Sequence, residues 1–176
     1  MKANRSRVAR ATAALTLAVA ASLSVSACGT GAGPGVAAVT DGQVIHESDL
    51  DDIAADFSRV QGAQAPSRSE MVALLVARPY VLQSLSSKGT ALTEQGVREL
   101  LGQELPDPSE ATVRYIQAAS SQQQLDQAAV QQIQQTMAAA DIEVNPRYGE
   151  FEPGQGLVPP QENWIQSATP QANPTP

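Results

Sequence analysis

Hydrophobic residues recur at intervals of three and four along most of the chain between positions 48 and 140, the spacing of one face of an α-helix. The first of these stretches, from Ser48 to Gly62, carries one continuous apolar stripe made of Leu50, Ile53, Ala54 and Phe57. Similar stripes predict further helices that start at Ser67, Thr93, Asp107 and Asp126. The pattern therefore predicts a chain of helices joined by short connections.

Polar residues and one proline refine these predicted helices. Ser48 and Asp51 have the spacing of a capping box, which predicts the start of the first helix. Pro79 lies inside the second helix, where it removes a backbone donor and crowds the preceding turn. We therefore expect a kink or a break near Arg78. In the third helix we expect Leu100 to point inward.

Two short stretches have the pattern of β-strands instead. Residues 36–39 and 43–45 flank Thr40-Asp41-Gly42, in which Asp-Gly favours the positive dihedral angles of a tight hairpin turn. Residues 142–144 alternate apolar and polar after the last helix. A strand at the far end of a helical domain usually returns to pair with strands at its start. We predict that residues 142–144 pair with the hairpin.

Composition agrees with this fold class. Aromatic residues make up 3% of the chain, and alanine, leucine and valine supply most of its apolar mass. This composition suits packed helices better than stacked sheets. The expected fold is mainly α, a helical domain tied by a small antiparallel sheet.

The N-terminal region has the order of a secretory signal, with basic residues, an apolar run from 11 to 25 and then small residues. Val25-Ser26-Ala27-Cys28 resembles the lipobox of bacterial lipoproteins, in which the cysteine receives a diacylglyceryl group before cleavage on its amino side. The resemblance implies a signal peptide over residues 1–27 and lipidation of Cys28. The alternative is a conventional signal peptide with an incidental cysteine.

Lipidation would decide where the protein is located. Two or three acyl chains, such as palmitate, anchor a protein stably, whereas one chain holds it only marginally. Cys28 is therefore interpreted as an anchor to the extracytoplasmic face of the cell membrane, and not as a nucleophile. Because Cys28 is the single cysteine of the chain, we expect neither a disulfide nor a thiolate metal site.

The mature chain divides into three parts. Residues 28–35 are rich in glycine and are interpreted as a flexible tether. Residues 36–153 carry all predicted helices and strands, which is one domain of ordinary size. Residues 154–176 are rich in proline and glutamine, and we expect them to be disordered.

Charge excludes some partners. The predicted leader holds four of the 11 basic residues and none of the 18 acidic ones, which leaves a mature net charge of about −11. Such a surface repels nucleic acid and anionic lipid headgroups. No later stretch is long enough and apolar enough to span a bilayer.

Two segments resemble a known family. Residues 37–45, followed by Ser48-Asp49-Leu50, are similar to the opening of SurA-type and parvulin-type periplasmic foldases. Residues 142–149 resemble the closing strand of SurA N-terminal-like lipoproteins from actinobacteria. The resemblance implies a helical cradle that holds unfolded or extended exported polypeptides in apolar grooves. It does not imply isomerase activity, because the chain has one histidine and lacks the parvulin catalytic domain.

The resulting hypothesis is a membrane-anchored, chaperone-like binder without catalysis, cofactor or small-molecule substrate. Its candidate polypeptide-binding surface consists of four large apolar side chains: Phe57, Met71, Leu82 and Met137. The alternative is a structural lipoprotein that docks one specific partner in the cell envelope. The two hypotheses differ in whether the apolar stripes leave an open groove.

Other chemistry is less well supported. His46 has no second histidine or cysteine to work with, so a capping or solvent-facing role is favoured. Serines near the helix ends, including Ser121, lack a neighbouring base and are expected at the surface. Asp49, Asp51, Asp52 and Asp56 suggest a cation site at first sight, but the first three fall in a first helical turn, where the helix dipole favours acids, and we expect no metal site.

Overall fold

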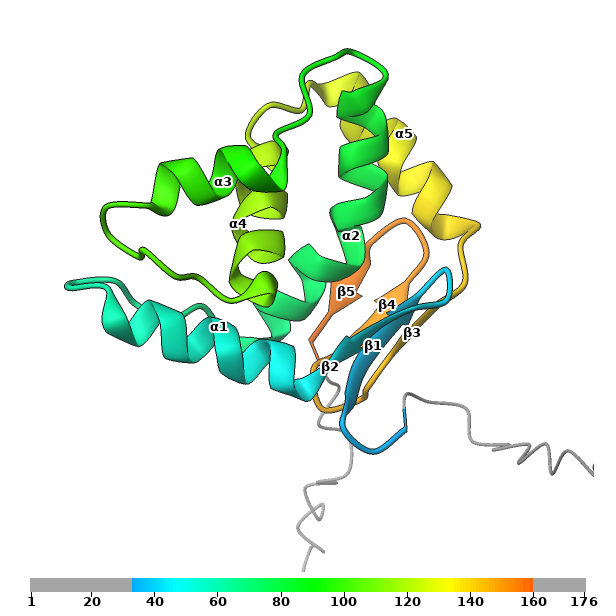
Figure 1. Cartoon of the computed structure of the whole chain (residues 1–176). Helices are drawn as coiled ribbons and strands as arrows, with labels where there is room; N and C mark the ends of the chain where they lie inside the picture. The colour runs from blue at the N-terminus through cyan, green and yellow to red at the C-terminus, as the bar shows by residue number, and fades with distance from the viewer. Residues whose placement is uncertain (1–32, 160–176) are drawn as a thin grey trace, which may run out of the picture.

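The computed structural model describes residues 33–159, of which about half are helical (Figure 1). The helices are α1 (Glu47–Arg59), α2 (Arg68–Ser86), α3 (Glu94–Leu101), α4 (Glu110–Gln122) and α5 (Gln127–Ala138). The strands are β1 (Val36–Thr40), β2 (Gln43–His46), β3 (Ile142–Val144), β4 (Glu150–Glu152) and β5 (Gly156–Val158). The predicted mainly α fold with a small antiparallel sheet is confirmed.

The N-terminal sheet has three strands in the order β2-β1-β3, and both pairings are antiparallel. The hairpin turn between β1 and β2 places Asp41 at φ 46° and Gly42 at φ 76°, the left-handed geometry that Asp-Gly favours. Ala38 of β1 lies opposite Val144 of β3. The predicted hairpin and its pairing with the returning strand are therefore confirmed.

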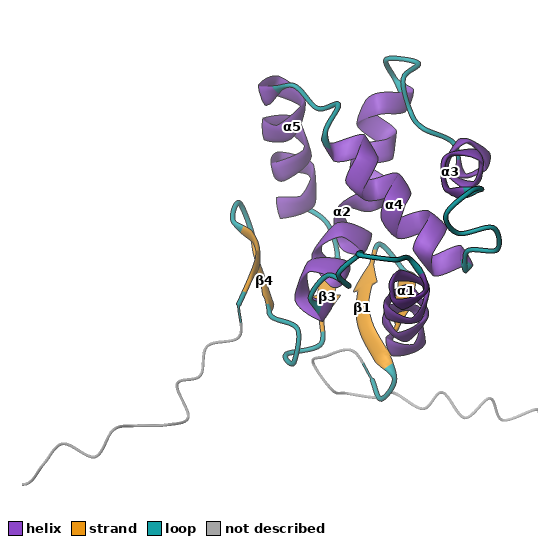
Figure 2. Cartoon of the chain, turned by 90° about the vertical axis from the view of Figure 1, so that its left-hand side faces the viewer, coloured by secondary structure: helices purple, strands orange, loops and turns teal. Residues whose placement is uncertain are grey.

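Helix α4 lies at the centre of the helical part and packs against α1, α2 and α3. Figure 2 shows α1 and α3 nearly end-on, on the same side of α4, with α5 on the opposite side. α5 packs against α2. Because α4 is covered from several sides, Ser121 near its end is fully buried, and the expectation that it lies at the surface is wrong.

Two clusters of buried apolar side chains form the core. The larger one joins the sheet to α1, α2 and α4 and includes Ala38, Ile53, Met71 and Val72. The smaller one lies between α2 and α5 and includes Val81, Leu85 and Ile133. The half-buried Met137 contacts both clusters.

The chain after β3 closes back onto its own beginning. Asn145 donates from its backbone N–H to the Ala37 carbonyl (2.9 Å) and from its side-chain amide to the Val36 carbonyl (3.1 Å). The Tyr148 hydroxyl donates to Oε1 of Glu47 (3.0 Å). These contacts hold the residues that follow the sheet against the start of α1.

The ordered chain also extends further than predicted. Residues 156–158 form β5 and pair with β4, so the boundary expected at Pro153, with disorder from 154, is too early. Gly149 explains why the short hairpin can dock: its φ is 138°, and a Cβ there would collide with the Val158 carbonyl. The signal for β5 was weak, because only Leu157 and Val158 are apolar among glycine, proline and glutamine.

Three local expectations need correction. The first helix starts at Glu47, and its capping pair is His46 with Asp49, because the His46 backbone N–H donates to the Asp49 carboxylate (2.9 Å). α2 continues through Pro79, so a break is excluded. Leu100 is 70% exposed, because α3 is short and packs mainly against α4, which covers only the side that carries Val97.

Several predictions lie outside the described residues. These are the signal peptide over 1–27, lipidation of Cys28, most of the tether over 28–35 and the tail beyond Pro159. None of the helices within 33–159 is long and apolar enough to cross a membrane.

Candidate functional site

An apolar hollow with a volume of about 210 Å³ is lined by residues of α1, α3 and α4. Its apolar walls come from all three helices and from the loops that follow α1 and α3: Phe57, Val60, Leu101, Leu105 and Ile116. We call this hollow the pocket. Ala63 and Glu104, both exposed, stand at its edge.

The walls of the pocket follow from the amphipathic spacing of its helices. Phe57 lies one turn beyond the buried Ile53 on α1, and Ile116 lies one turn beyond the buried Thr112 on α4. The Phe57 ring is held edge-on against the Tyr115 ring, with centroids 5.9 Å apart. Leu105, 2% exposed, fixes the loop between α3 and α4. The apolar walls are thus anchored in the core.

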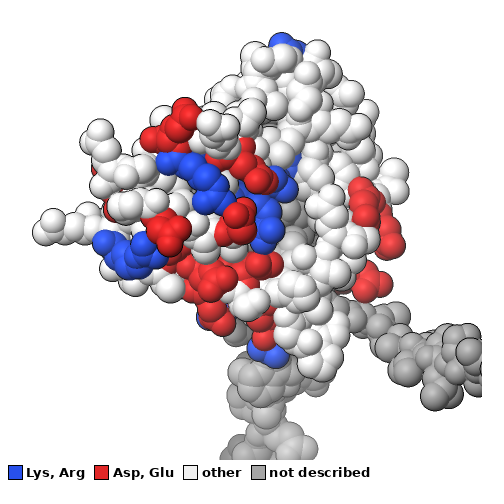
Figure 3. All heavy atoms as spheres, viewed as in Figure 1, with Lys and Arg blue, Asp and Glu red and all other residues white. Residues whose placement is uncertain are grey.

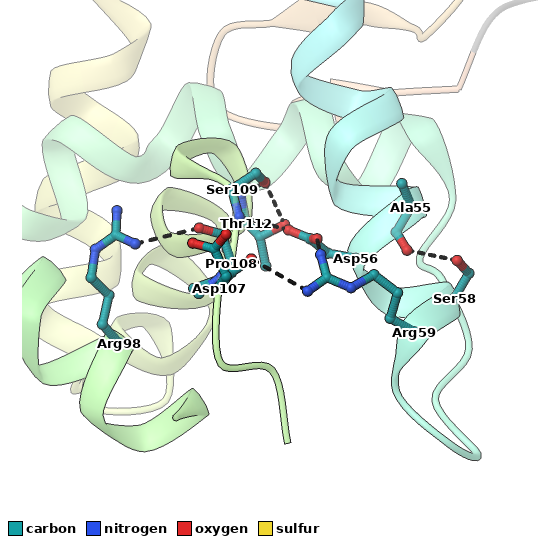
Figure 4. Close-up of polar contacts among 9 residues, drawn as sticks. All are labelled: Ala55, Asp56, Ser58, Arg59, Arg98, Asp107, Pro108, Ser109 and Thr112. Atoms are coloured by element: carbon teal, nitrogen blue, oxygen red, sulfur yellow. Dashed lines mark hydrogen bonds and ion pairs between the residues drawn. The ribbon is translucent and has the colours of Figure 1, made fainter. Parts of the chain in front are cut away.

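A buried carboxylate fixes α1 to the start of α4 beside the pocket. Asp56 is 4% exposed, and its two oxygens accept hydrogen bonds from the Ser109 backbone N–H (2.8 Å) and from Nη1 of Arg59 (2.7 Å) (Figure 4). Ser109 is also the N-cap of α4, and its hydroxyl accepts from the Thr112 backbone N–H (3.1 Å). The negative charge therefore lies at the positive end of the α4 dipole.

The environment of Asp56 favours its ionised form. Burial alone would raise the pKa of Asp56, but hydrogen bonds from Thr112 and Ser109 and the charge of Arg59 together outweigh burial and lower its pKa. Both carboxylate oxygens are already engaged within the chain. Asp56 is therefore a structural acid that fixes two helices, and not a general base.

Two arginines hold the loop that leads into α4 from opposite sides. Arg59 of α1 donates from Nη2 to the Asp107 carbonyl (3.4 Å), and Arg98 of α3 donates from Nη1 to the Pro108 carbonyl (3.3 Å). Figure 4 shows the two side chains reaching this loop from the two helices. Arg98 also pairs with Glu110 (2.5 Å). These contacts tie α1 and α3 to the same loop beside the pocket.

The basic side chains of the described residues are all paired. Apart from the four arginines and lysines that precede residue 33, each basic residue forms one ion pair: Arg59–Asp56, Arg68–Asp51, Arg78–Glu94, Lys88–Asp126, Arg98–Glu110, Arg114–Asp49 and Arg147–Glu47. Seven of the 18 acids take part, and Glu162 lies outside the described residues. The other ten acids have no basic partner within 33–159.

The surface reflects this imbalance. Over the face that carries α1 and α3, blue and red atoms adjoin one another, whereas the red patches at the right edge of Figure 3 have no blue neighbours in view. Asp49 and Asp51, which suggested a cation site, bind separate arginines. No group of three or more histidine, cysteine, aspartate or glutamate side chains within the described chain is placed to hold a metal ion.

Two other hollows are polar. One, of about 450 Å³, is lined by Glu47, Asp51, Arg68 and Arg147, whose charges already pair with one another. The other, of about 280 Å³, lies between α2 and α5 and is lined largely by uncharged glutamine, serine and threonine side chains. Neither combines apolar walls with an unpaired charge, as the pocket does.

The four predicted surface residues do not come together. Phe57 lines the pocket, Leu82 is half-buried on α2, and Met137 contacts the two core clusters. Met71 is 1% exposed, so its expected place on a binding surface is wrong, because the sheet and the neighbouring helices cover that face of α2. An open groove lined by these four residues is not present.

Sequence reasoning missed most of the pocket. Leu101 and Ile116 are apolar residues within helical patterns, but periodicity does not tell which apolar positions a short neighbouring helix leaves uncovered. Asp56 and Arg59 carried one usable signal, an acid and a base three residues apart on the same helix face. Ser109, which donates a hydrogen bond to Asp56, is 53 residues further along the chain, so no local sequence pattern predicts this contact.

Comparisons with known proteins found no relative that could assign a role to the pocket. No protein-family model, no curated protein and no solved structure matches the chain. The function is therefore argued below from the pocket and from the sequence features already described.

Proposed function

We propose that this chain is a lipid-anchored, extracytoplasmic protein that binds apolar side chains of unfolded or extended exported polypeptides in the pocket, without a chemical step. The observation that carries the proposal is an apolar hollow of about 210 Å³ whose walls are fixed in the core and whose edge is open to solvent. The membrane anchor is supported by the lipobox-like segment that ends at Cys28.

The size of the pocket suits one large side chain. An apolar cavity of roughly 150 Å³ accommodates benzene. A hollow of about 210 Å³ therefore accommodates a phenylalanine, leucine or methionine side chain, and it falls below the range of roughly 300–1,000 Å³ that is typical of pockets for drug-sized ligands. A polypeptide with such a side chain is a better match than a free metabolite.

The proposed anchor keeps the domain that carries the pocket beside the membrane. Gly33, the first described residue, is five positions after Cys28, and an extended chain spans at most about 3.6 Å per residue. Gly33, where the described part begins, would then stay within roughly 20 Å of the lipid surface. Polypeptides that leave the membrane would meet the pocket there.

A second candidate is a structural lipoprotein that docks one specific cell-envelope partner. It is favoured by the sparse exposure of large apolar side chains, which among the described residues are limited to Val44, Leu100 and Val130. A general chaperone exposes broader apolar surface, because it must accept many sequences. A single small pocket instead suits one chosen segment.

One experiment tests whether the pocket binds a denatured client protein. Ala63→Trp adds an indole at the exposed edge of the pocket without removing a core contact, and Ala128→Trp makes the same change on the exposed side of α5. We expect the full chain to suppress aggregation of a denatured client and to lose this effect with Ala63→Trp but not with Ala128→Trp. Equal behaviour of all three proteins would refute the pocket as the binding site.

A second experiment separates the two candidates. Crosslinking in cells, from a photoreactive residue placed at Ala63, reports what enters the pocket. A spread of exported proteins among the products favours the chaperone-like function. One dominant product favours docking to a single partner.

A further inference from the structure

We infer that the segment bound in the pocket is cationic: an apolar side chain flanked by lysine or arginine residues of the same polypeptide. This inference rests on the proposed function and adds the charge of the bound segment to it. It follows from how the described residues distribute their charges.

Among residues 33–159, no basic side chain is left without an acidic partner to attract an acidic ligand. Each of the basic residues within 33–159 is held by an acid of the same chain, while ten acids there have no basic partner. The excess of acids repels an acidic segment and attracts a basic one.

The same imbalance is present at the pocket itself. Glu104 stands at the edge, exposed and without a basic partner among the described residues. Asp107, in the loop that borders the pocket, is also exposed and unpaired. The nearest cations are occupied, because Arg59 neutralises Asp56 and Arg98 neutralises Glu110.

The apolar side chain and the basic residue of the bound segment contact different parts of the pocket. The apolar side chain enters between Phe57, Leu101 and Ile116, and a lysine or arginine two or three residues away reaches Glu104 along the edge. Apolar burial supplies the affinity, and the exposed charges supply the preference between segments. An exposed ion pair changes affinity by up to about fivefold.

The test uses the full lipidated chain in nanodiscs of phosphatidylcholine, with empty nanodiscs as the control for peptide binding to lipid. The probes are three fluorescent peptides with one leucine-phenylalanine centre and flanks of lysine, glutamine or glutamate. We expect the lysine peptide to bind about twofold to fivefold more tightly than the glutamine peptide, and the glutamate peptide to bind more weakly than both. Added salt should reduce these differences.

Two charge variants locate the effect. Glu104→Lys should abolish the preference for lysine flanks and strengthen binding of the glutamate peptide. Glu150→Lys makes the same change at an exposed, unpaired acid on β4, away from the pocket, and should leave the order of the three peptides unchanged. Equal effects of the two variants would contradict a role for Glu104.

The failures can be told apart. Equal affinity for all three peptides, lost with Ala63→Trp, overturns the inference and leaves the proposed function standing. Peptide binding that Ala63→Trp does not reduce overturns the proposed function and the inference together. A lysine preference that is lost with Glu104→Lys and kept with Glu150→Lys supports both.

Discussion

The core beneath α2 and the corner around Asp56 are held together by different interactions. Beneath α2, fully buried apolar side chains such as Met71 and Val72 pack against the sheet. Around Asp56, a carboxylate and two arginines join α1 and α3 to the loop before α4. Buried apolar side chains pack without gaps, whereas a network of hydrogen bonds holds two helices at a fixed separation and can leave a hollow beside it. The pocket lies at this corner, with Asp56 in its lining.

The largest expected effect tests the core. Met71→Ala should lower the free energy of unfolding by about 2–5 kcal/mol, because it leaves a cavity where a fully buried side chain was. Urea denaturation of variant and wild type measures the change. If Met71 belonged to a binding surface, as the sequence suggested, the variant would instead be nearly as stable as wild type and would bind less peptide.

Next in size is Gly149→Ala, expected to cost about 1–3 kcal/mol locally, because alanine must adopt a positive φ and collides with the Val158 carbonyl. Hydrogen exchange should show loss of protection at β4 and β5. Peptide binding in the pocket should not change. Protection of β5 equal to wild type would contradict the close packing described for Gly149.

At the corner, Asp56→Asn should cost about 1–3 kcal/mol, because Arg59 and the Ser109 N–H lose a charged acceptor in a buried place. Unlike the core variant, it should also weaken peptide binding, since α1 is no longer fixed to α4. Thermal unfolding and peptide titration together check this pair of effects. A loss of stability with unchanged binding would separate the network from the pocket.

The same carboxylate predicts a dependence on pH. The folded pKa of Asp56 is lowered, so its contribution to stability is present above the unfolded value of about 3.9 and is lost as pH falls through the folded pKa. The stability difference between wild type and Asp56→Asn should therefore shrink in acid. Denaturation at a series of pH values below 5 measures it, and a difference that stays constant would exclude an ionised Asp56.

The smallest expected effect on stability comes from Arg98→Met, at about 1 kcal/mol or less, because Arg98 is partly exposed and its ion pair with Glu110 lies at the surface. Its effect on peptide affinity should be relatively larger, since α3 loses its attachment to the Pro108 carbonyl. A variant that is strongly destabilised would show that the corner is held as tightly as the core.

Sequence reasoning succeeded where a pattern is local and failed where contacts are distant. The helix α1 was predicted from the spacing of Leu50, Ile53 and Phe57, and the hairpin turn from Asp41-Gly42. The burial of Met71 and the exposure of Leu100 depend on which neighbouring element covers each helix face. Hydrophobic periodicity does not predict that neighbour. The same limit applied to the pocket, whose walls come from segments about fifty residues apart.

The order of strands in the three-stranded sheet has a mechanical consequence. β1 is the middle strand, flanked by β2 and β3, and it begins three residues after the first described residue. A force applied to the segment before β1 would have to break the hydrogen bonds to β2 and to β3 at once. It would also have to break the hydrogen bond from the Asn145 side chain to the Val36 carbonyl. Resistance to such a pull is governed by the rate of unfolding. Stretching single molecules from the N-terminal side should therefore meet a higher rupture force than stretching them from the C-terminal side, where β5 is paired with a single strand, β4.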